Sequence, residues 1–401
     1  MSTGVMLNLA HNQWASRPAS ARFWNLGHLA ETLRNMSPAA ERTYPLAALK
    51  CEATDKGDIR LVSPRGSSAF SHWSFRQFCT LAGCPADFLT GTLGNYPGLA
   101  VDCLNTGLQV KSKKRAEDER SGDVKLLAQG DGNGGVNLLA AYSDKYARVP
   151  DLDVVEAIRQ YAPDWKTPPA RPNDEETAKF ARPATAEDCG GFSFVQPGEM
   201  IAPAGVYRDD RSMFCFLVNP NQVIDNGPNG GGLYQGLIGM NSEVGFKKLK
   251  FMSFLFGGAC GNHYIHNASE INLVEFVHKG ELITRWRATM IDAITRYSHE
   301  GMSAAARMVE AAKAFTLGHD KAATLDRLAD MKSLALARVH LEQAWNLAEQ
   351  YGHIDAQGLP PTTVWGFVGG LTRYSQAAQY ANVRHDLDAA GAKLLAMASA
   401  S

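Results

Sequence analysis

Residues 256–280 concentrate side chains that could bind a metal or catalyse a reaction. The stretch FGGACGNHYIHNASEINLVEFVHKG contains one cysteine, three histidines and two glutamates. Cys260, His263 and His266 could bind zinc, with Glu270 as a fourth ligand or as a base. The spacing is not that of a standard zinc signature, and the glycines that precede a β-branched run favour a turn entering a strand. We therefore favour no metal here and keep zinc as an alternative.

A nucleophilic cysteine is a second chemistry that this stretch could support. Cys260 would need a base within hydrogen-bond reach, and His263 or His278 could supply one. A single cysteine in the apolar context FLFGGAC is more typical of a buried thiol than of a reactive one. We therefore favour a structural role for Cys260.

Three acidic residues suggest a third chemistry. Asp209, Asp210 and Glu243 lie in neighbouring strand-like segments and could converge on Mg²⁺, as a metal-dependent nuclease would require. A pair of aspartates before an arginine is equally ordinary in a turn. We favour a protein without a cofactor and without enzymatic activity, and we keep the nuclease as an alternative.

Composition predicts a globular protein with a large core. The chain has 401 residues, of which 45% are hydrophobic and 20% charged, and its net charge of −1 creates no global field that attracts nucleic acid. The apolar runs are strand-sized and the first residues lack the features of a signal peptide, so we expect no membrane association and a cytoplasmic location. The seven cysteines show no paired CxxC spacing, which favours reduced thiols.

Two local segments, KSKKR and FKKLK, could nevertheless bind nucleic acid. Their basic residues are Lys111, Lys113, Lys114, Arg115, Lys247, Lys248 and Lys250. With the nearby aromatic residues Tyr146, Phe246 and Phe251, they could line a groove in which bases stack and phosphates are neutralised. The alternative is that each segment is a solvated face, because AEDER follows KSKKR directly.

The periodicity of the apolar residues divides the chain into five parts. The stripe Leu282, Trp286, Met290, Ile294 and Tyr297 has helical spacing, whereas the preceding segments alternate as strands do. The expected parts are an N-terminal arm and helix (1–42), a first α/β part (43–162), a linker or long loop (163–190), a β-rich part (191–280) and a helical C-terminal region (281–401). The predicted fold class is α+β, with a mixed or antiparallel β-sheet body, packed helices and a mostly helical C-terminal region.

Four short motifs occur in a characteristic order between residues 70 and 395. They are the strand-turn-helix LAAYSDKYARVPDLDVVEAI, the segment GMNSEVGFKKL, the turn ACGNH and the helix TTVWGFVGGLTRYSQ. Their defining residues are Ser143, Asp144, Tyr146, Asn241, Ser242, Glu243, Gly245, Cys260, Asn262, Trp365, Thr372 and Tyr374. In this order they resemble the phage- and plasmid-like proteins grouped as Domain of Unknown Function 932. The chain departs from that pattern at His263 and at Gly369-Gly370.

The resemblance implies a mobile-element setting in a bacterial host cell, and it implies no catalytic residues. We expect a nucleic-acid-associated, homo-oligomeric protein that binds or anneals single-stranded DNA during replication or recombination. The main alternative is a counter-defence protein that binds and inhibits a host nuclease or signalling enzyme.

Overall fold

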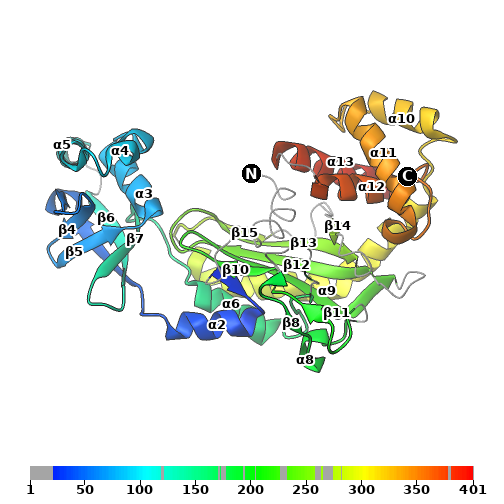
Figure 1. The fold of residues 1–401 in the computed structure, drawn as a ribbon, viewed down its shortest axis with the longest axis horizontal. Coiled ribbons are helices and arrows are strands. Elements are labelled where there is room, and N and C mark those ends of the chain that lie inside the picture. The colour runs from blue at the N-terminus through cyan, green and yellow to red at the C-terminus, as the bar shows by residue number, and fades with distance from the viewer. Residues whose placement is uncertain are drawn as a thin grey trace.

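The computed structural model describes residues 21–118, 122–169, 172, 178–192, 195–203, 205–225, 233–257, 263–264, 274–280, 282–377 and 381–400. It is an α+β fold in which a small sheet unit, a large sheet and a group of C-terminal helices follow one another along the long axis of the molecule (Figure 1). The predicted fold class is therefore confirmed.

The small sheet forms a unit of its own at one end of the molecule. Its six strands lie in the order β2-β6-β7-β5-β4-β3, and only the β5–β7 pair among them is parallel. The strands are β2 (Ala40–Pro45), β3 (Lys50–Ala53), β4 (Ile59–Ser63), β5 (Gly66–Phe70), β6 (Asp123–Gly130) and β7 (Val136–Ser143), and a 3₁₀ turn follows β2 (Leu46–Ala48). Helices α3 (His72–Ala82), α4 (Ala86–Thr92) and α5 (Pro97–Glu117) cover one face and share a core with it.

The large sheet is built around three long antiparallel strands that are neighbours in the chain. Its order is β1-β10-β11-β12-β13-β14, with β15 also paired to β13. The strands are β1 (Arg22–Phe23), β10 (Val206–Arg208), β11 (Met213–Asp225), β12 (Leu233–Asn241), β13 (Leu249–Gly257), β14 (His263–Tyr264) and β15 (Val274–Phe276). Strands β8 (Arg182–Pro183) and β9 (Met200–Ile201) form a separate ribbon next to α8 (Ala186–Cys189).

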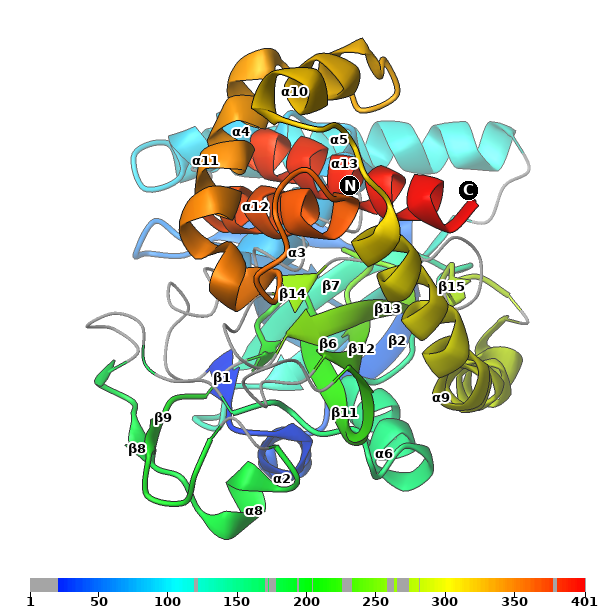
Figure 2. The ribbon, with the colours of Figure 1, turned by 90° about the vertical axis from the view of Figure 1, so that its right-hand side faces the viewer.

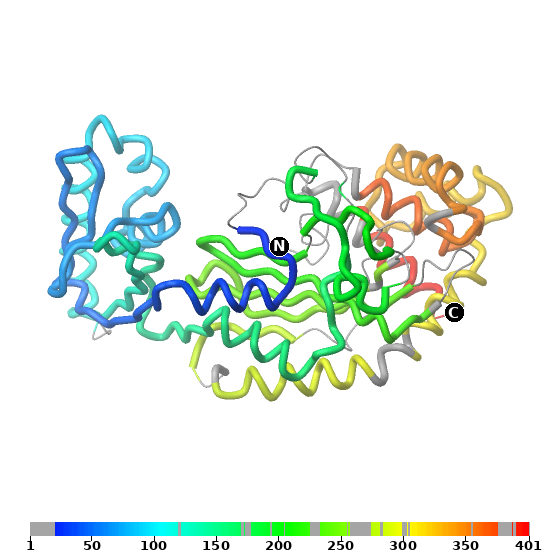
Figure 3. Tube along the Cα trace, turned by 60° about the horizontal axis from the view of Figure 1, so that its bottom comes forward, coloured from blue at the N-terminus to red at the C-terminus, as the bar shows by residue number. Residues whose placement is uncertain are grey.

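The long strands are apolar on both faces, which explains their nearly continuous hydrophobic sequences. One face packs on α2 (Leu26–Asn35), α6 (Asp151–Tyr161) and α9 (Leu282–Ala314), which cross it side by side (Figure 3). The other face carries a cluster of aromatic side chains. That cluster includes Phe214, Phe216, Tyr234, Phe254 and Phe256.

Helix α9 connects the sheet to the C-terminal helices. Its first half places the predicted stripe, including Trp286 and Tyr297, in the core beneath the sheet. Its last turns place Met308 and Val309 in a second core. That core is formed by α10 (Lys321–Asp330), α11 (Arg338–Asp355), α12 (Val364–Ala377) and α13 (Ala381–Ala400), which stack at one end of the molecule (Figure 2).

The glycine at 370 allows α11 and α12 to approach closely. A Cβ atom built on Gly370 would lie 2.0 Å from the carbonyl oxygen of Ala344, so a side chain there would force the helices apart. Gly370, which belongs to one of the two places where the chain differs from the pattern that it resembles, therefore has a packing role.

The predicted first α/β part, residues 43–162, does not coincide with the small unit. Helix α2 already packs on α6 and on the large sheet, the chain then forms the small unit, and α6 returns to the large sheet. The small unit is thus an insertion between α2 and α6, and α6 does not belong with it. In the predicted linker 163–190, Trp165 is buried against Tyr297, with the ring centroids 5.6 Å apart.

Two further features of the chain are the apolarity of its helices and the state of its cysteines. None of the helices in the described ranges combines the length and apolarity that a bilayer crossing needs. The six described cysteines are free, and Cys51, Cys79, Cys189 and Cys215 are buried. Burial raises the pKa of the Cys51, Cys79 and Cys215 thiols to about 12, so they stay protonated at neutral pH.

The core position of Trp286 leads to a first prediction. Trp286→Ala should lower the free energy of unfolding by about 3–5 kcal/mol, because the indole is 6% exposed between α9 and the sheet. Chemical denaturation measures the change. The exposed neighbour Arg285 supplies the control, since Arg285→Ala should stay within about 0.5 kcal/mol of wild type. Equal effects of the two substitutions would contradict this packing.

Candidate nucleic-acid interface

Two of the family-like motifs, about a hundred residues apart in sequence, meet where the small unit joins the large sheet. The Tyr146 hydroxyl donates to the carbonyl oxygen of Ser242 at 2.7 Å. Gly245 has a φ of +76°, and a Cβ atom there would lie 3.4 Å from the Tyr146 ring. The positive φ favours glycine at this position, whereas the Tyr146 ring would leave room for a Cβ atom in ordinary contact.

A buried polar cluster fixes this meeting point. One carboxylate oxygen of Glu243 accepts from Arg148 Nε at 2.7 Å, and the other accepts from the backbone N–H of Asp151 at 2.8 Å. Asp151 accepts in turn from Arg208 Nε at 2.8 Å and from the Asn241 amide at 2.8 Å. The end of β12, the start of α6 and strand β10 are joined by these contacts.

The acidic side chain of Asp151 is the most perturbed group of the cluster. Burial raises its pKa to about 6, and the negative charge of Glu243 acts in the same direction. Arg208 and the amide of Asn241 oppose this shift, because they stabilise the ionised form.

The loop after β12 is also held by the small unit. The Val244 carbonyl oxygen accepts from Trp73 Nε1 at 3.1 Å and from Gln77 Nε2 at 2.6 Å, and both donors lie on α3. The Ser242 hydroxyl donates to the Arg211 carbonyl oxygen at 2.6 Å and accepts from the N–H of Phe246 at 2.9 Å. The loop that carries Phe246 is therefore fixed on both sides.

Phe246 lies half-buried at the surface of this junction among an aromatic ring and two cations. The Trp73 ring meets it edge-on, with the centroids 4.9 Å apart. Lys247 Nζ lies 4.8 Å and Arg211 Cζ 5.8 Å from the centroid of the Phe246 ring. We call Trp73, Arg211, Phe246 and Lys247 the Phe246 platform.

Further lysines lie in the segments that meet at the junction. Lys248 and Lys250 both pair with Glu275 on the neighbouring strand β15. Lys279, which is exposed, forms an isolated β-bridge with Tyr146. Lys145 adjoins Tyr146 and is also exposed. The second predicted basic segment therefore lies in a lysine-rich part of the surface, although Glu275 neutralises part of its charge.

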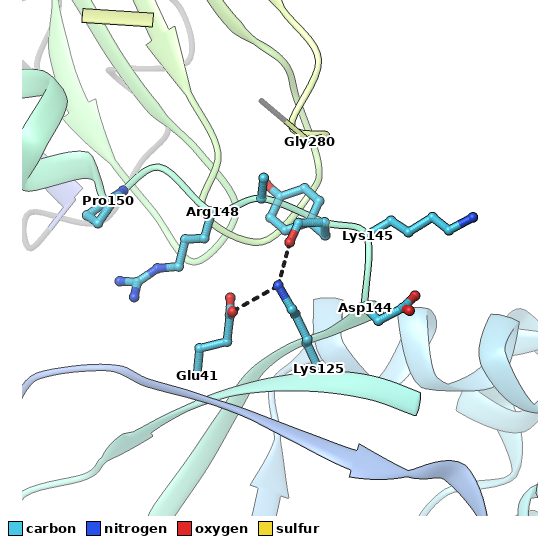
Figure 4. Close-up of a pocket in the computed structure, with 9 residues that line it drawn as sticks. Glu41, Lys125, Asp144, Lys145, Arg148, Pro150 and Gly280 are labelled. Atoms are coloured by element: carbon cyan, nitrogen blue, oxygen red, sulfur yellow. Dashed lines mark hydrogen bonds and ion pairs between the residues drawn. The ribbon is translucent and has the colours of Figure 1, made fainter. Parts of the chain in front are cut away.

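An open cavity of about 530 Å³ lies beside this junction. Lys125 donates to the Tyr146 carbonyl oxygen at 2.9 Å and pairs with Glu41 at 3.3 Å on one side of the cavity. Figure 4 shows the Lys145 and Arg148 side chains pointing to opposite sides, so they do not converge on one ligand atom.

The first predicted basic segment lies on the last turns of α5. Lys111 packs beside Gly83, and Arg115 donates to the Asp123 carbonyl oxygen at 3.5 Å, so both contact their own unit. Lys113 and Lys114 are exposed. Only these two of the four side chains are well presented to a nucleic acid.

Two expectations about stacking residues need correction. Phe251 is 1% exposed in the core beneath the large sheet, so no base can stack on it. The Tyr146 ring stacks on His278 at 5.0 Å and contacts Tyr142 at 4.3 Å, and its hydroxyl is bonded to Ser242. Tyr146 is half-buried at the edge of the open cavity, and these contacts give it a role in positioning the loop.

The three acids proposed for Mg²⁺ do not converge. Asp209 accepts from the N–H groups of Arg211 and Ser212, Asp210 pairs with Arg211, and Glu243 is committed to the buried cluster. Across the described ranges, no group of three or more His, Cys, Asp or Glu side chains is arranged to hold a metal.

The zinc candidates lie almost entirely outside the described residues. This applies to Cys260, His266 and Glu270, and also to the motif residue Asn262. His263 is described as part of β14, where it pairs with Phe256. The other candidate base, His278, donates from Nδ1 to the Ala147 carbonyl oxygen at 3.0 Å, and burial lowers its pKa.

The C-terminal motif has a structural place in the helical core. Trp365 is 1% exposed, and the Thr372 hydroxyl donates to the Val368 carbonyl oxygen within its own helix. The Tyr374 hydroxyl lies 3.0 Å from His340 Nδ1 on α11. These residues join α12 to its neighbours and lie in a different core from the junction.

Several residues of the junction had no recognisable signal in the sequence. Arg148, Asp151, Arg208, Arg211 and Trp73 are single polar or aromatic residues whose partners lie far away in the chain. Arg148 and Asp151 lie within the motif stretch LAAYSDKYARVPDLDVVEAI, and that position was the one available hint.

Comparisons of the chain with protein-family models, with curated proteins and with solved structures gave no match. The resemblance to Domain of Unknown Function 932 therefore stays an expectation based on its four motifs.

The raised pKa of Asp151 predicts how stability depends on pH. The folded state binds this proton more tightly than the unfolded chain, whose aspartates titrate near pH 4, so folding takes up a proton between about pH 4 and pH 6. The stability of wild type relative to Asp151→Asn should fall as pH rises through this window, by up to about 1.4 kcal/mol per pH unit. Above about pH 7 the difference should be constant.

Chemical denaturation of both proteins from pH 4 to pH 8 measures this difference. Groups that do not interact with Asp151 titrate alike in both proteins, so their contributions cancel in this difference. A difference that increases with pH would contradict the raised pKa.

Proposed function

We propose that the protein binds single-stranded DNA at the junction of its two sheets, with the Phe246 platform as the contact for a base. The observation that carries this proposal is the half-buried Phe246 ring with Trp73 at its edge and Lys247 and Arg211 close to it. Bases stack on aromatic rings and on guanidinium planes, and adjacent cations neutralise the phosphates.

The arrangement of the loop supports this proposal. A stacking residue is most effective when its position is fixed before binding, because little conformational entropy is then lost. Phe246 meets this condition through the Ser242 hydroxyl, and Val244 is held by two donors from α3. The lysines at 145, 248, 250 and 279 belong to the segments that meet at the junction, and they could contact a phosphate backbone without base-specific contacts.

The family-like motifs suggest the biological setting. We infer a cytoplasmic protein of a phage, prophage or plasmid in a bacterial host, acting in replication or recombination. Binding or annealing of single strands needs neither a metal nor a catalytic group.

The central prediction concerns one aromatic side chain. Phe246→Leu keeps most of the apolar volume but removes the ring, so it should weaken binding to a single-stranded oligonucleotide at least about fivefold. Fluorescence anisotropy at low salt measures the affinity. Phe315→Leu is the matched control, because Phe315 is also half-buried beneath an arginine, Arg327, at 5.2 Å but lies in the C-terminal helices.

Thermal denaturation of both variants verifies that they fold. Equal affinities of Phe246→Leu and wild type would contradict a stacking role. If wild type does not bind single strands at about 50 mM salt, the DNA proposal fails and the counter-defence alternative, with a host protein as partner, gains weight.

The lysines provide a second prediction, based on salt dependence. Replacing Lys247 and Lys248 by Ala should lower the slope of log K against log salt by about 0.7 for each phosphate that the variant no longer neutralises. Replacing Lys113 and Lys114 removes the same charge from α5 and should change the slope less. A larger change of the slope in the variant that lacks Lys113 and Lys114 would indicate that DNA binds at α5 instead.

A further inference from the structure

Helix α5 buries one apolar face and exposes two large apolar side chains on the opposite side. Ala100, Leu104 and Leu108 are buried against the small sheet and α3. On the other side, Leu99 is 45% exposed and Val110 is 58% exposed. These two lie eleven residues apart, about three helical turns, so they form one stripe on the outer side of the helix.

Two more exposed apolar side chains lie on or next to the same pair of helices. Phe88 on α4 and Tyr96, directly before α5, are 57% and 67% exposed. Of the nine large hydrophobic residues that the described chain exposes, four lie on this helical pair. Figure 1 places α5 at the outer end of the small unit, away from the large sheet. Concentrated exposed apolar surface of this kind marks an interaction site.

Charged side chains lie beside the same stripe, with a negative charge near one end of the helix and positive charges near the other. Asp102 lies beside Leu99 on the N-terminal half of the helix, and Lys113 and Lys114 lie beside Val110 on the C-terminal half. All three side chains are exposed, and in the described part of the chain none of them has an ion-pair partner within 4 Å. A helix with opposite charges at its two ends complements a second copy of itself that runs in the opposite direction.

We propose that the outer face of α5 is a two-fold interface between two copies of this chain. Antiparallel α5 helices that cross near Thr106 place the apolar stripes together and bring Asp102 of each copy to the lysine end of the other. Such an interface is isologous, because the same patch is used by both copies. Since one helix pair with Phe88 and Tyr96 at its border is small for an interface, the dimer should be concentration-dependent.

Sedimentation velocity of the full chain over a range of concentrations tests the proposal. Wild type should shift from monomer to dimer as the concentration rises, and Val110→Glu should raise the dissociation constant at least about tenfold. Val339→Glu is the matched control, because Val339 is 56% exposed on α11 and should leave the dimer unchanged.

Exchanging the charges of Asp102 and Lys113 tests the electrostatic contribution to the dimer. Asp102→Lys and Lys113→Asp should each weaken the dimer, and the double variant should recover it, because opposite charges then face each other again in both copies. A wild type that stays monomeric, a dimer that ignores Val110→Glu, or a double variant that remains as weak as the single ones would each overturn the proposal. Because DNA binding is not measured, these outcomes are independent of the Phe246 platform.

Discussion

The junction depends on one buried carboxylate, that of Glu243. It is nearly inaccessible to water, and its two oxygens are satisfied by the Arg148 guanidinium and by the first N–H of α6. A buried charge that loses one partner is strongly destabilising, by about 3–5 kcal/mol. Glu243 therefore ties the loop after β12 to the segment by which the chain returns from the small unit.

The position of the surface residues follows from this constraint. With Glu243 and Asn241 fixed, Ser242 and Val244 present their backbone groups to Tyr146 and to α3. Phe246 is then held three residues beyond the carboxylate, at the border of the two sheets. The motif Asn-Ser-Glu-x-Gly thus has a physical basis as the inner support of a surface, and its members need not touch a ligand themselves.

The sequence predicted what depends on local periodicity. The stripe of α9, including Trp286 and Tyr297, has helical spacing because it faces one core, and the strands β11 to β13 are recognisable as apolar runs. The insertion of the small unit between α2 and α6 was not predictable, because helix signals do not reveal which sheet a helix covers. Phe251 was misplaced for a related reason, since both faces of a doubly covered strand are apolar.

The candidate site was predictable only in part. FKKLK and the motif at 241–245 are visible as segments, whereas the contacts of Trp73 with Val244 and of Arg208 with Asp151 join residues that are 171 and 57 positions apart. Pairing over such distances is set by the tertiary fold, and a single sequence contains no trace of it. In α5, by contrast, the buried residues Ala100, Leu104 and Leu108 have a spacing of four, which is local helical periodicity.

Ultraviolet cross-linking of the wild-type chain to a single-stranded oligothymidylate, followed by mass spectrometry of the linked peptides, tests the central claim most directly. A base stacked on the Phe246 platform should link to the peptide that contains Phe246 or to the one that contains Trp73. Linked peptides that come only from α5 or from the C-terminal helices would contradict the account.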